Sequence, residues 1–428
     1  MITTDTLIVG CGCAGLYCAL KLPKDQKITI LTKADTESSD SYLAQGGICV
    51  QHDDNDFDSF YEDTMKAGHH ENDPKSVELM IQYSRDVVDD LIGYGVRFNR
   101  LEDGSLDYTR EGAHSKPRIL YHQDITGKEI TSHLLARVRE LDNVTILEYT
   151  TLIDLVVRDG SCCGGIIRQK DGKLDAIHAK QTVLATGGIG GLFTHSTNFH
   201  HLTGDALAMS LKHGIKLKNI DYIQIHPTTF YDKDGDGRSF LISESVRGEG
   251  AKLYDKNMER FADELMPRDR LTKAIHKQME KDGTEFVWED LRTIPHDQLH
   301  EHFPNIVAYC AEKGYDVDKE CIPVVPAQHY FMGGVEINHS SQTSMPQLYA
   351  VGETACNGVH GRNRLASNSL LESLVFAGFA AQHITAHTVP ETDMPSIDWT
   401  AYEDSDALEA QYKKLVLDAI HEEEKKHV

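Results

Sequence analysis

The chain lacks the long apolar run that a membrane helix needs. It has 428 residues, yet no uninterrupted apolar stretch approaches the roughly 18–20 residues that span a bilayer. An apolar segment begins almost at Met1, which leaves no room for a signal peptide. We therefore expect a cytoplasmic protein without a membrane anchor.

Positive charge is scarce. Against 67 acidic residues stand 43 basic ones, which gives a formal net charge of −24. Such a surface repels the phosphates of nucleic acids and anionic membranes, so neither is expected as a partner. A site for an anionic substrate must then be built locally from Arg and His.

The nine cysteines lack the spacing of a metal centre. No pair stands as CxxC, and no Cys/His spacing indicates zinc or an iron–sulfur cluster. We expect free thiols, as in cytosolic proteins, and no metal cofactor.

A glycine-rich turn stands near the N-terminus. Residues 5–9 form a predicted strand, Gly10-x-Gly12-x-x-Gly15 follows, and residues 16–22 and 27–31 have helical and strand character. In this context GxGxxG indicates a dinucleotide site, with a plain strand–helix turn as the alternative. The acid that usually ends the second strand and holds a ribose is absent, and Lys33 stands there instead.

A second feature lies at residues 360–372, HGRNRLASNSLLE. Serines and an asparagine follow two arginines, and Ser369 with Glu372 predicts a capping box at a helix start. The free N–H groups and positive end of such a helix, together with Arg362 and Arg364, favour an anionic or electron-rich ligand. An ordinary capped helix is the alternative.

The length suits two or three domains. Predicted strands at 181–191 and 346–353 run into glycines and belong with the first domain, whereas 221–328 has a different, charge-rich texture. The predicted fold class is α/β. It has a Rossmann-like domain in two parts (1–220 and 329–388), an inserted α+β capping domain (221–328) and a short helical tail (389–428) with a charged helix at 407–426.

Nine motifs in fixed order carry a family resemblance over about residues 4–387. They are the glycine turn at 10–15, AQGG at 44–47, ATGG at 185–188, TGD at 203–205, QIHP at 224–227, RGEG at 247–250, PRD at 267–269, HY at 329–330 with GG at 333–334, and the segment at 360–372. Together they resemble the succinate dehydrogenase/fumarate reductase flavoprotein family, most closely its L-aspartate oxidase branch.

The resemblance implies FAD as the cofactor. The implied FAD contacts are Gly10, Cys11, Gly12, Cys13, Ala14, Gly15, Lys33, Asp40, Ser41, Ala44, Gln45, Gly46, Gly47, Asp205, Glu353, Ser369 and Leu370. Respiratory members carry, at the position of Asp40, a histidine that bonds covalently to the flavin. The implied FAD is therefore non-covalent.

The same resemblance implies a dicarboxylate site with a proton-transfer arginine. Arg268 is the implied proton-transfer group, with His226 and Glu244 as further catalytic residues. The implied contacts to one substrate carboxylate are His226 and Ser243, and those to the other are His329 and Arg364, with Ser367 nearby. Glu111 stands where succinate dehydrogenases place an apolar aromatic, and it would pair with a substrate ammonium. A solvated loop acid is the alternative for Glu111.

The implied reaction is FAD-dependent oxidation of L-aspartate to iminoaspartate, with O2 (giving H2O2) or fumarate as acceptor. It is the first step of de novo NAD biosynthesis, and quinolinate synthase would receive the short-lived product. The alternatives are a soluble fumarate reductase or succinate dehydrogenase, and a flavin-binding protein without turnover, which the short tail favours. A closing movement of the capping domain is also expected.

Overall fold

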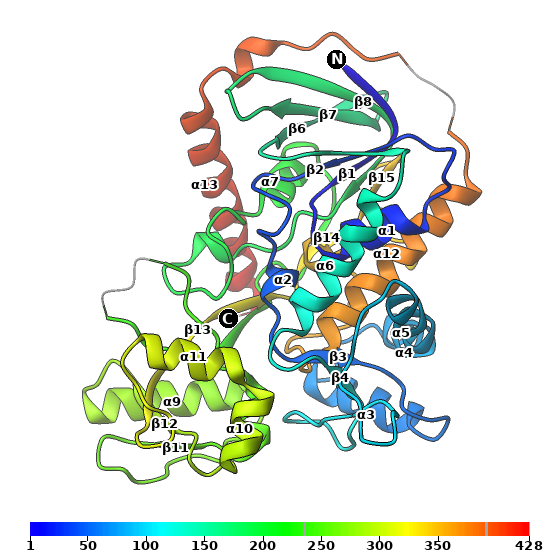
Figure 1. The fold of residues 1–428 in the computed structure, drawn as a ribbon. Coiled ribbons are helices and arrows are strands. Elements are labelled where there is room, and N and C mark those ends of the chain that lie inside the picture. The colour runs from blue at the N-terminus through cyan, green and yellow to red at the C-terminus, as the bar shows by residue number, and fades with distance from the viewer. Residues whose placement is uncertain (234–236, 390–392, 428) are drawn as a thin grey trace.

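The structure is a computed structural model that describes residues 1–233, 237–389 and 393–427. A large sheet with helices on both faces forms its main body, and a smaller lobe of strands and helices lies beside it (Figure 1). Part of the predicted tail, residues 390–392 and 428, lies outside the described residues. Within the described ranges, no helix combines the length and apolarity needed to cross a membrane.

The main sheet has seven strands in the order β5-β2-β1-β8-β7-β6, with β15 also paired to β8. The pairs among β5, β2, β1, β8 and β15 are parallel, whereas β6 and β7 are antiparallel. The bounds are β1 (Ile2–Val9), β2 (Ile28–Leu31), β5 (Val144–Leu147), β6 (Thr151–Arg158), β7 (Ser161–Arg168), β8 (Leu174–Leu184) and β15 (Leu348–Ala350).

Alternation along β1 supplies a core to each face of this sheet. Ile8 faces one apolar cluster, which includes the helices α1 (Cys13–Lys21) and α12 (Asn368–Ala386). Its neighbours Leu7 and Val9 face the other cluster, on the side of α7 (Asp205–Lys212) and α13 (Ser405–Glu424). Because successive strand side chains point to opposite faces, one apolar strand serves both cores.

The smaller lobe is built on the sheet β10-β13-β12-β11. Its elements are β10 (Ile223–Phe230), α8 (Glu244–Gly248), β11 (Lys252–Tyr254), α9 (Arg268–Asp282), β12 (Val287–Asp290), α10 (His296–His302), α11 (Pro304–Glu312) and β13 (Ile322–Phe331). The lobe has its own apolar core, which includes Phe230, Leu271 and Val324. The predicted boundary at 328/329 falls inside β13, so the four-part division stays a prediction.

The remaining elements connect or cover these two bodies. They are α2 (Asp40–Leu43), β3 (Gly47–Cys49), α3 (Phe57–Ala67), α4 (Pro74–Gln82), α5 (Ser84–Gly93), β4 (Ile119–Tyr121), α6 (Thr126–Arg139), η1 (Gly190–Leu192), α7 (Asp205–Lys212), β9 (Leu217–Lys218), β14 (Gly334–Glu336), η2 (Gly352–Thr354), β16 (Ala355–Cys356), η3 (Trp399–Tyr402), α13 (Ser405–Glu424) and η4 (Lys425–His427).

The predicted tail helix is α13, which packs along the main body beside α7 (Figure 1). Its apolar residues Leu408, Tyr412, Val416 and Ile420 recur every four positions and are buried in the second core. This spacing places them on one helical face, which explains how a mostly charged helix docks.

The predicted capping box at α12 is wrong. The helix begins at Asn368, and the preceding Ser367 has a left-handed backbone (φ 61°) without a side-chain cap. Ser369 instead accepts a hydrogen bond from Arg364 Nη1 at 2.6 Å. Glu372 accepts one from Asn357 Nδ2 and lies near His360. Buried polar partners outside the helix therefore take the side chains that would have capped it.

Candidate functional site

One large pocket opens at the carboxyl ends of the parallel strands. Val9, Leu31, Ala185 and Val351 line it, each at or directly after a strand end, and its space amounts to about 1730 Å³ including the part open to solvent. Open α/β sheets bind ligands at this edge. The pocket also brings together every predicted site residue except Gly15.

The glycine turn shapes one wall of this pocket. Gly10 has φ +123°, and a Cβ there would lie 1.9 Å from the carbonyl oxygen of Ala185. A Cβ at Gly15 would lie 2.2 Å from the carbonyl oxygen of Gly10. Gly10 therefore allows β1 to approach β8, while Gly15 allows α1 to pack on the turn and stays outside the pocket.

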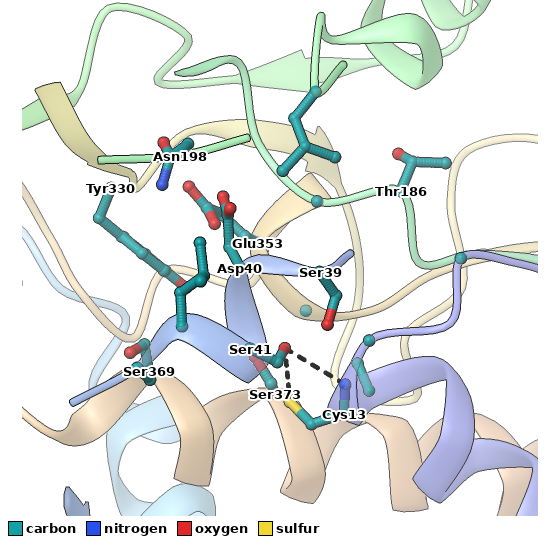
Figure 2. Close-up of a pocket in the computed structure, with 18 of the residues that line it drawn as sticks. Cys13, Ser39, Asp40, Ser41, Thr186, Asn198, Tyr330, Glu353, Ser369 and Ser373 are labelled. Atoms are coloured by element: carbon teal, nitrogen blue, oxygen red, sulfur yellow. Dashed lines mark hydrogen bonds between the residues drawn. The ribbon is translucent and has the colours of Figure 1, made fainter. Parts of the chain in front are cut away.

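Next to the turn, buried polar atoms face the pocket without partners. Within the described residues, Ser39 Oγ, Asp40 Oδ2 and Gln45 Oε1 are buried and accept or donate no hydrogen bond. Ser41 Oγ donates to Cys13 Sγ and accepts from the Cys13 N–H at 3.2 Å (Figure 2). Because buried polar groups are normally paired, these atoms fit a polar ligand such as a dinucleotide.

Asp40 and Glu353 bring two carboxyl groups into the same part of the pocket (Figure 2). Burial raises the pKa of Asp40, and burial together with repulsion from Asp40 raises the pKa of Glu353. Asp40 accepts from the Phe199 N–H, and Glu353 from the Phe331 N–H. A carboxyl that keeps its proton can donate to a ligand oxygen or nitrogen, so the pair suits a neutral polar ligand group.

Lys33 lies at the far end of the pocket but its ammonium is fully used by the protein. It donates to His201 O (3.0 Å), Thr203 Oγ1 (3.2 Å) and Asp205 Oδ2 (2.8 Å). An ammonium has three donors, so none is left over for a ligand in this arrangement. Lys33 thus ties β2 to the start of α7.

At the other end, two arginines share one amide oxygen. Gln224 Oε1 accepts from Arg268 Nη1 at 2.9 Å and from Arg364 Nε at 3.2 Å. Arg364 also stacks over the Tyr330 ring, 4.5 Å from its centroid. Gln224 stands inside the QIHP motif, but nothing in its residue type indicated that it would position two cations.

Arg268 is also ion-paired to Glu244. Its Nε lies 2.6 Å from Glu244 Oε2, and both side chains are buried. Burial acts to raise the pKa of Glu244, but Arg268 and Arg247 outweigh it and hold the pKa below its usual range. Glu244 is therefore ionised beside Arg268, where it can accept a proton that the arginine passes on.

His226 and His329 face each other with ring centroids 5.0 Å apart. Burial and the neighbouring arginines lower the pKa of both rings well below the usual value. His329 Nδ1 bonds to Thr197 Oγ1 at 2.7 Å, while His226 Nε2 is buried and unpartnered among the described residues. Both rings are thus neutral, and His226 Nε2 can donate to a substrate oxygen in the tautomer whose Nδ1 accepts from the Thr228 N–H at 3.2 Å.

Glu111 is buried, with only 4% of its surface exposed. Oε1 accepts from Ser245 Oγ at 2.6 Å, and Oε2 accepts from Ser367 Oγ at 2.5 Å. Burial and repulsion from Glu244 raise its pKa. A buried, oriented carboxylate at a pocket wall differs from a solvated loop acid, which was the alternative.

Ser243 directly precedes α8 and caps it, since its Oγ accepts from the Ser245 N–H at 3.3 Å. Sequence reasoning missed other residues that line the pocket. They include Ser39, Thr186, Thr197, Asn198, Arg238 and Tyr330. Most of them come from loops between strands, where polar residues are common and carry no spacing signal.

The chain is similar in sequence to known proteins. A family model described as FAD binding domain matches residues 5–370. An L-aspartate oxidase of Clostridium perfringens is 46% identical over 416 residues, which cover 97% of this chain and 94% of that protein. One of Clostridium acetobutylicum is 47% identical over 383 residues, covering 90% and 88%.

Solved structures agree on the fold. A quinol–fumarate reductase with menaquinol molecules superposes with a TM-score of 0.85 at 29% identity, covering all of this chain and 76% of its own. The open conformation of a flavocytochrome c3 fumarate reductase gives 0.72 at 27% identity, covering 90% and 78%. The matches confirm the predicted family resemblance, the α/β fold class with its FAD-binding domain, and FAD as the cofactor.

Proposed function

Because the chain belongs to the L-aspartate oxidases among the FAD-binding flavoenzymes, we propose that it oxidises L-aspartate to iminoaspartate. The observation that carries this proposal is the buried carboxylate of Glu111 in a pocket wall that otherwise gathers arginines and histidines. We propose that this reaction is the first step of de novo NAD biosynthesis.

Glu111 selects for an amino acid over a plain dicarboxylate. The ammonium of aspartate offers the charge that this buried carboxylate lacks, whereas succinate leaves the carboxylate unpaired. Ser245 and Ser367 already hold both of its oxygens, so the group is oriented before a substrate arrives. The site therefore needs little rearrangement when aspartate binds.

Cationic and neutral hydrogen-bond donors around the pocket would bind the two substrate carboxylates. His226 and Ser243 would bind one, and His329 and Arg364 the other. Arg364 offers a planar guanidinium, which suits a carboxylate, and Gln224 fixes its orientation. Neutral histidines donate hydrogen bonds without adding positive charge that would repel the substrate ammonium.

Proton movement falls to the pair of Arg268 and Glu244. Arginine ordinarily keeps its proton, so exchange at Arg268 requires burial, neighbouring cations and a partner that takes the proton. Glu244 at 2.6 Å is that partner, and Arg247 is a further buried cation that acts on both. When fumarate is the acceptor, Arg268 would instead give its proton to the substrate and regain one by way of Glu244.

FAD, when bound, supplies the acceptor for the hydride that leaves C2 of aspartate while the amine loses a proton. The two electrons would go on to O2, which would give H2O2, or to fumarate, which would give succinate. Asp40 cannot form the covalent flavin bond of a histidine, so we propose that FAD is held non-covalently. The imine hydrolyses in water, so a quinolinate synthase that consumes it directly is the expected partner.

The proposal is tested by mixing the FAD-loaded protein anaerobically with L-aspartate or succinate and following the flavin absorbance. We expect rapid bleaching with L-aspartate and slow bleaching with succinate. Faster bleaching with succinate would identify a fumarate reductase or succinate dehydrogenase instead. No bleaching with either substrate would identify a flavin-binding protein without turnover.

A further inference from the structure

Two histidines and an aspartate converge on the outer face of the smaller lobe. His296 and His300 stand on α10, and Asp318 lies in the segment between α11 and β13. His296 Nδ1 is 3.0 Å from Asp318 Oδ1, and His300 Nε2 is 2.9 Å from Asp318 Oδ2. None of the three lines the cofactor pocket.

From this cluster we propose a binding site for a divalent transition metal ion of the zinc type. One ligand atom from each residue lies within 4.8 Å of the other two. Ligands about 2.0–2.1 Å from a tetrahedral zinc are separated by roughly 3.3 Å. The three side chains therefore need only small movements to take an ion between them.

The helix fixes half of this geometry. Positions i and i+4 share one helical face, and the two rings lie with centroids 4.3 Å apart. Two imidazole nitrogens and one carboxylate suit zinc, nickel or copper, whereas magnesium and calcium prefer oxygen alone. Three protein ligands leave coordination positions for water.

The third ligand is held by its own loop. Asp318 N–H donates to Asp316 Oδ1 at 3.1 Å, and Asp316 O accepts from the Lys319 and Glu320 N–H groups at 2.9 Å. Arg292 Nη1 adds a bond to Lys319 O at 3.0 Å. The carboxylate is therefore presented by an ordered turn. Simple His–Asp ion pairs would produce the same contacts, and only metal binding separates the two cases.

A metal here would join α10 to the segment that leads into β13. That strand carries Gln328 and His329, so the ion would brace the lobe that helps to form the pocket without touching the reacting atoms. Competing thiolate sites are limited, since all nine cysteines are buried. The cluster could not be recognised along the chain, because Asp318 stands 18 residues from His300.

The test is a calorimetric titration of the FAD-loaded protein with Zn2+, with crystals soaked in Zn2+ for anomalous diffraction at the zinc edge. We expect one tight equivalent and an anomalous peak between the three side chains. His300→Ala and Asp318→Ala should each weaken that equivalent at least about tenfold. His276→Ala, an exposed histidine on α9, is the matched control and should leave it unchanged.

Circular dichroism and flavin content of each variant show whether the fold is kept. No tight equivalent in the parent protein would overturn the proposal. So would unaltered zinc affinity in both folded variants, or a peak located elsewhere. Zinc binding should raise the melting temperature of the parent protein and not that of His300→Ala, whereas a mere ion-pair cluster would give the same melting temperature with and without zinc.

Discussion

Ser367 donates a hydrogen bond of 2.5 Å to Glu111, although 256 positions separate them in the chain. The serine stands directly before α12, at the position where a helix usually takes its cap, and its hydroxyl serves the carboxylate instead. A Cβ at Gly46 would lie 2.7 Å from Glu111 Oε1, so the backbone also closes on this group. The orientation of Glu111 is thus built from three separate segments.

Removing the charge of Glu111 should lower activity with L-aspartate far more than activity with succinate. Glu111→Gln keeps the shape but leaves a buried substrate ammonium without a counter-charge. We expect kcat/KM for L-aspartate to fall at least about 100-fold, while anaerobic flavin reduction by succinate falls far less. Glu102→Gln, an exposed acid in the preceding loop, is the control. An equal loss for both substrates would contradict a role in substrate choice.

The pH dependence of aspartate use should follow Glu111. Burial and Glu244 raise the pKa of Glu111, so acid protonates this carboxyl at a higher pH than an ordinary glutamate. The ammonium favours the carboxylate, so kcat/KM is greatest above that pKa and falls by up to tenfold per pH unit below it. Burial and the neighbouring arginines hold the pKa values of His226 and His329 well below the usual one, so neither ring gains its charge at the pH of an ordinary histidine.

Profiles of kcat/KM against pH for the parent protein and for Glu111→Gln provide the measurement. The acid limb should be present in the parent and absent from the variant. An acid limb of the same position in both would assign it to another group.

Arg268 should be required for chemistry and dispensable for the cofactor. Arg268→Lys keeps a positive charge but loses the two-point contact to Glu244 and Gln224. We expect turnover to fall by about 10³-fold with FAD content unchanged. Arg270→Lys, exposed two positions further along α9, should match the parent. Loss of bound flavin in Arg268→Lys would show that the residue supports the fold of the pocket rather than the reaction.

Lys33 should act on FAD affinity through Asp205. Lys33→Met removes the ammonium that joins β2 to the start of α7, so that end of the pocket loses its alignment. We expect about tenfold weaker FAD binding, from the loss of a charged hydrogen bond. Flavin fluorescence titration measures it, and excess FAD should restore activity. Lys24→Met is the exposed control, and equal losses in both variants would contradict the assignment.

The smaller lobe should move when a dicarboxylate binds. Gln224 on β10 holds Arg364 of the main body, so substrate carboxylates that recruit this arginine act across the boundary. Crystals with and without a dicarboxylate should differ in the angle between the two bodies. Identical angles would count against closure.

The sequence predicted the elements whose signals are local. The strand–turn–helix at the N-terminus, the tail helix and the fold class follow from apolar periodicity and glycine spacing. The capping box failed because Glu372 found buried partners, Asn357 and His360, that helix-start rules do not consider.

Tertiary contacts explain the other differences. No pattern along the chain could show that the Lys33 ammonium makes three hydrogen bonds within the protein. The contacts of Gln224 with two arginines were not predicted either, since only the folded chain brings both guanidinium groups to its amide oxygen. Local propensity is silent on such contacts, because each depends on segments far apart in the sequence.

The packing of α13 against the main body should affect FAD occupancy. A Cβ at Gly204 would lie 3.5 Å from Val416 of α13, and Gly204 directly precedes Asp205, the partner of Lys33. Cofactor occupancy and attachment of the chain's end should therefore be thermodynamically linked. In protein that has lost FAD, a protease should cut first near the C-terminus. Added FAD should slow that cleavage.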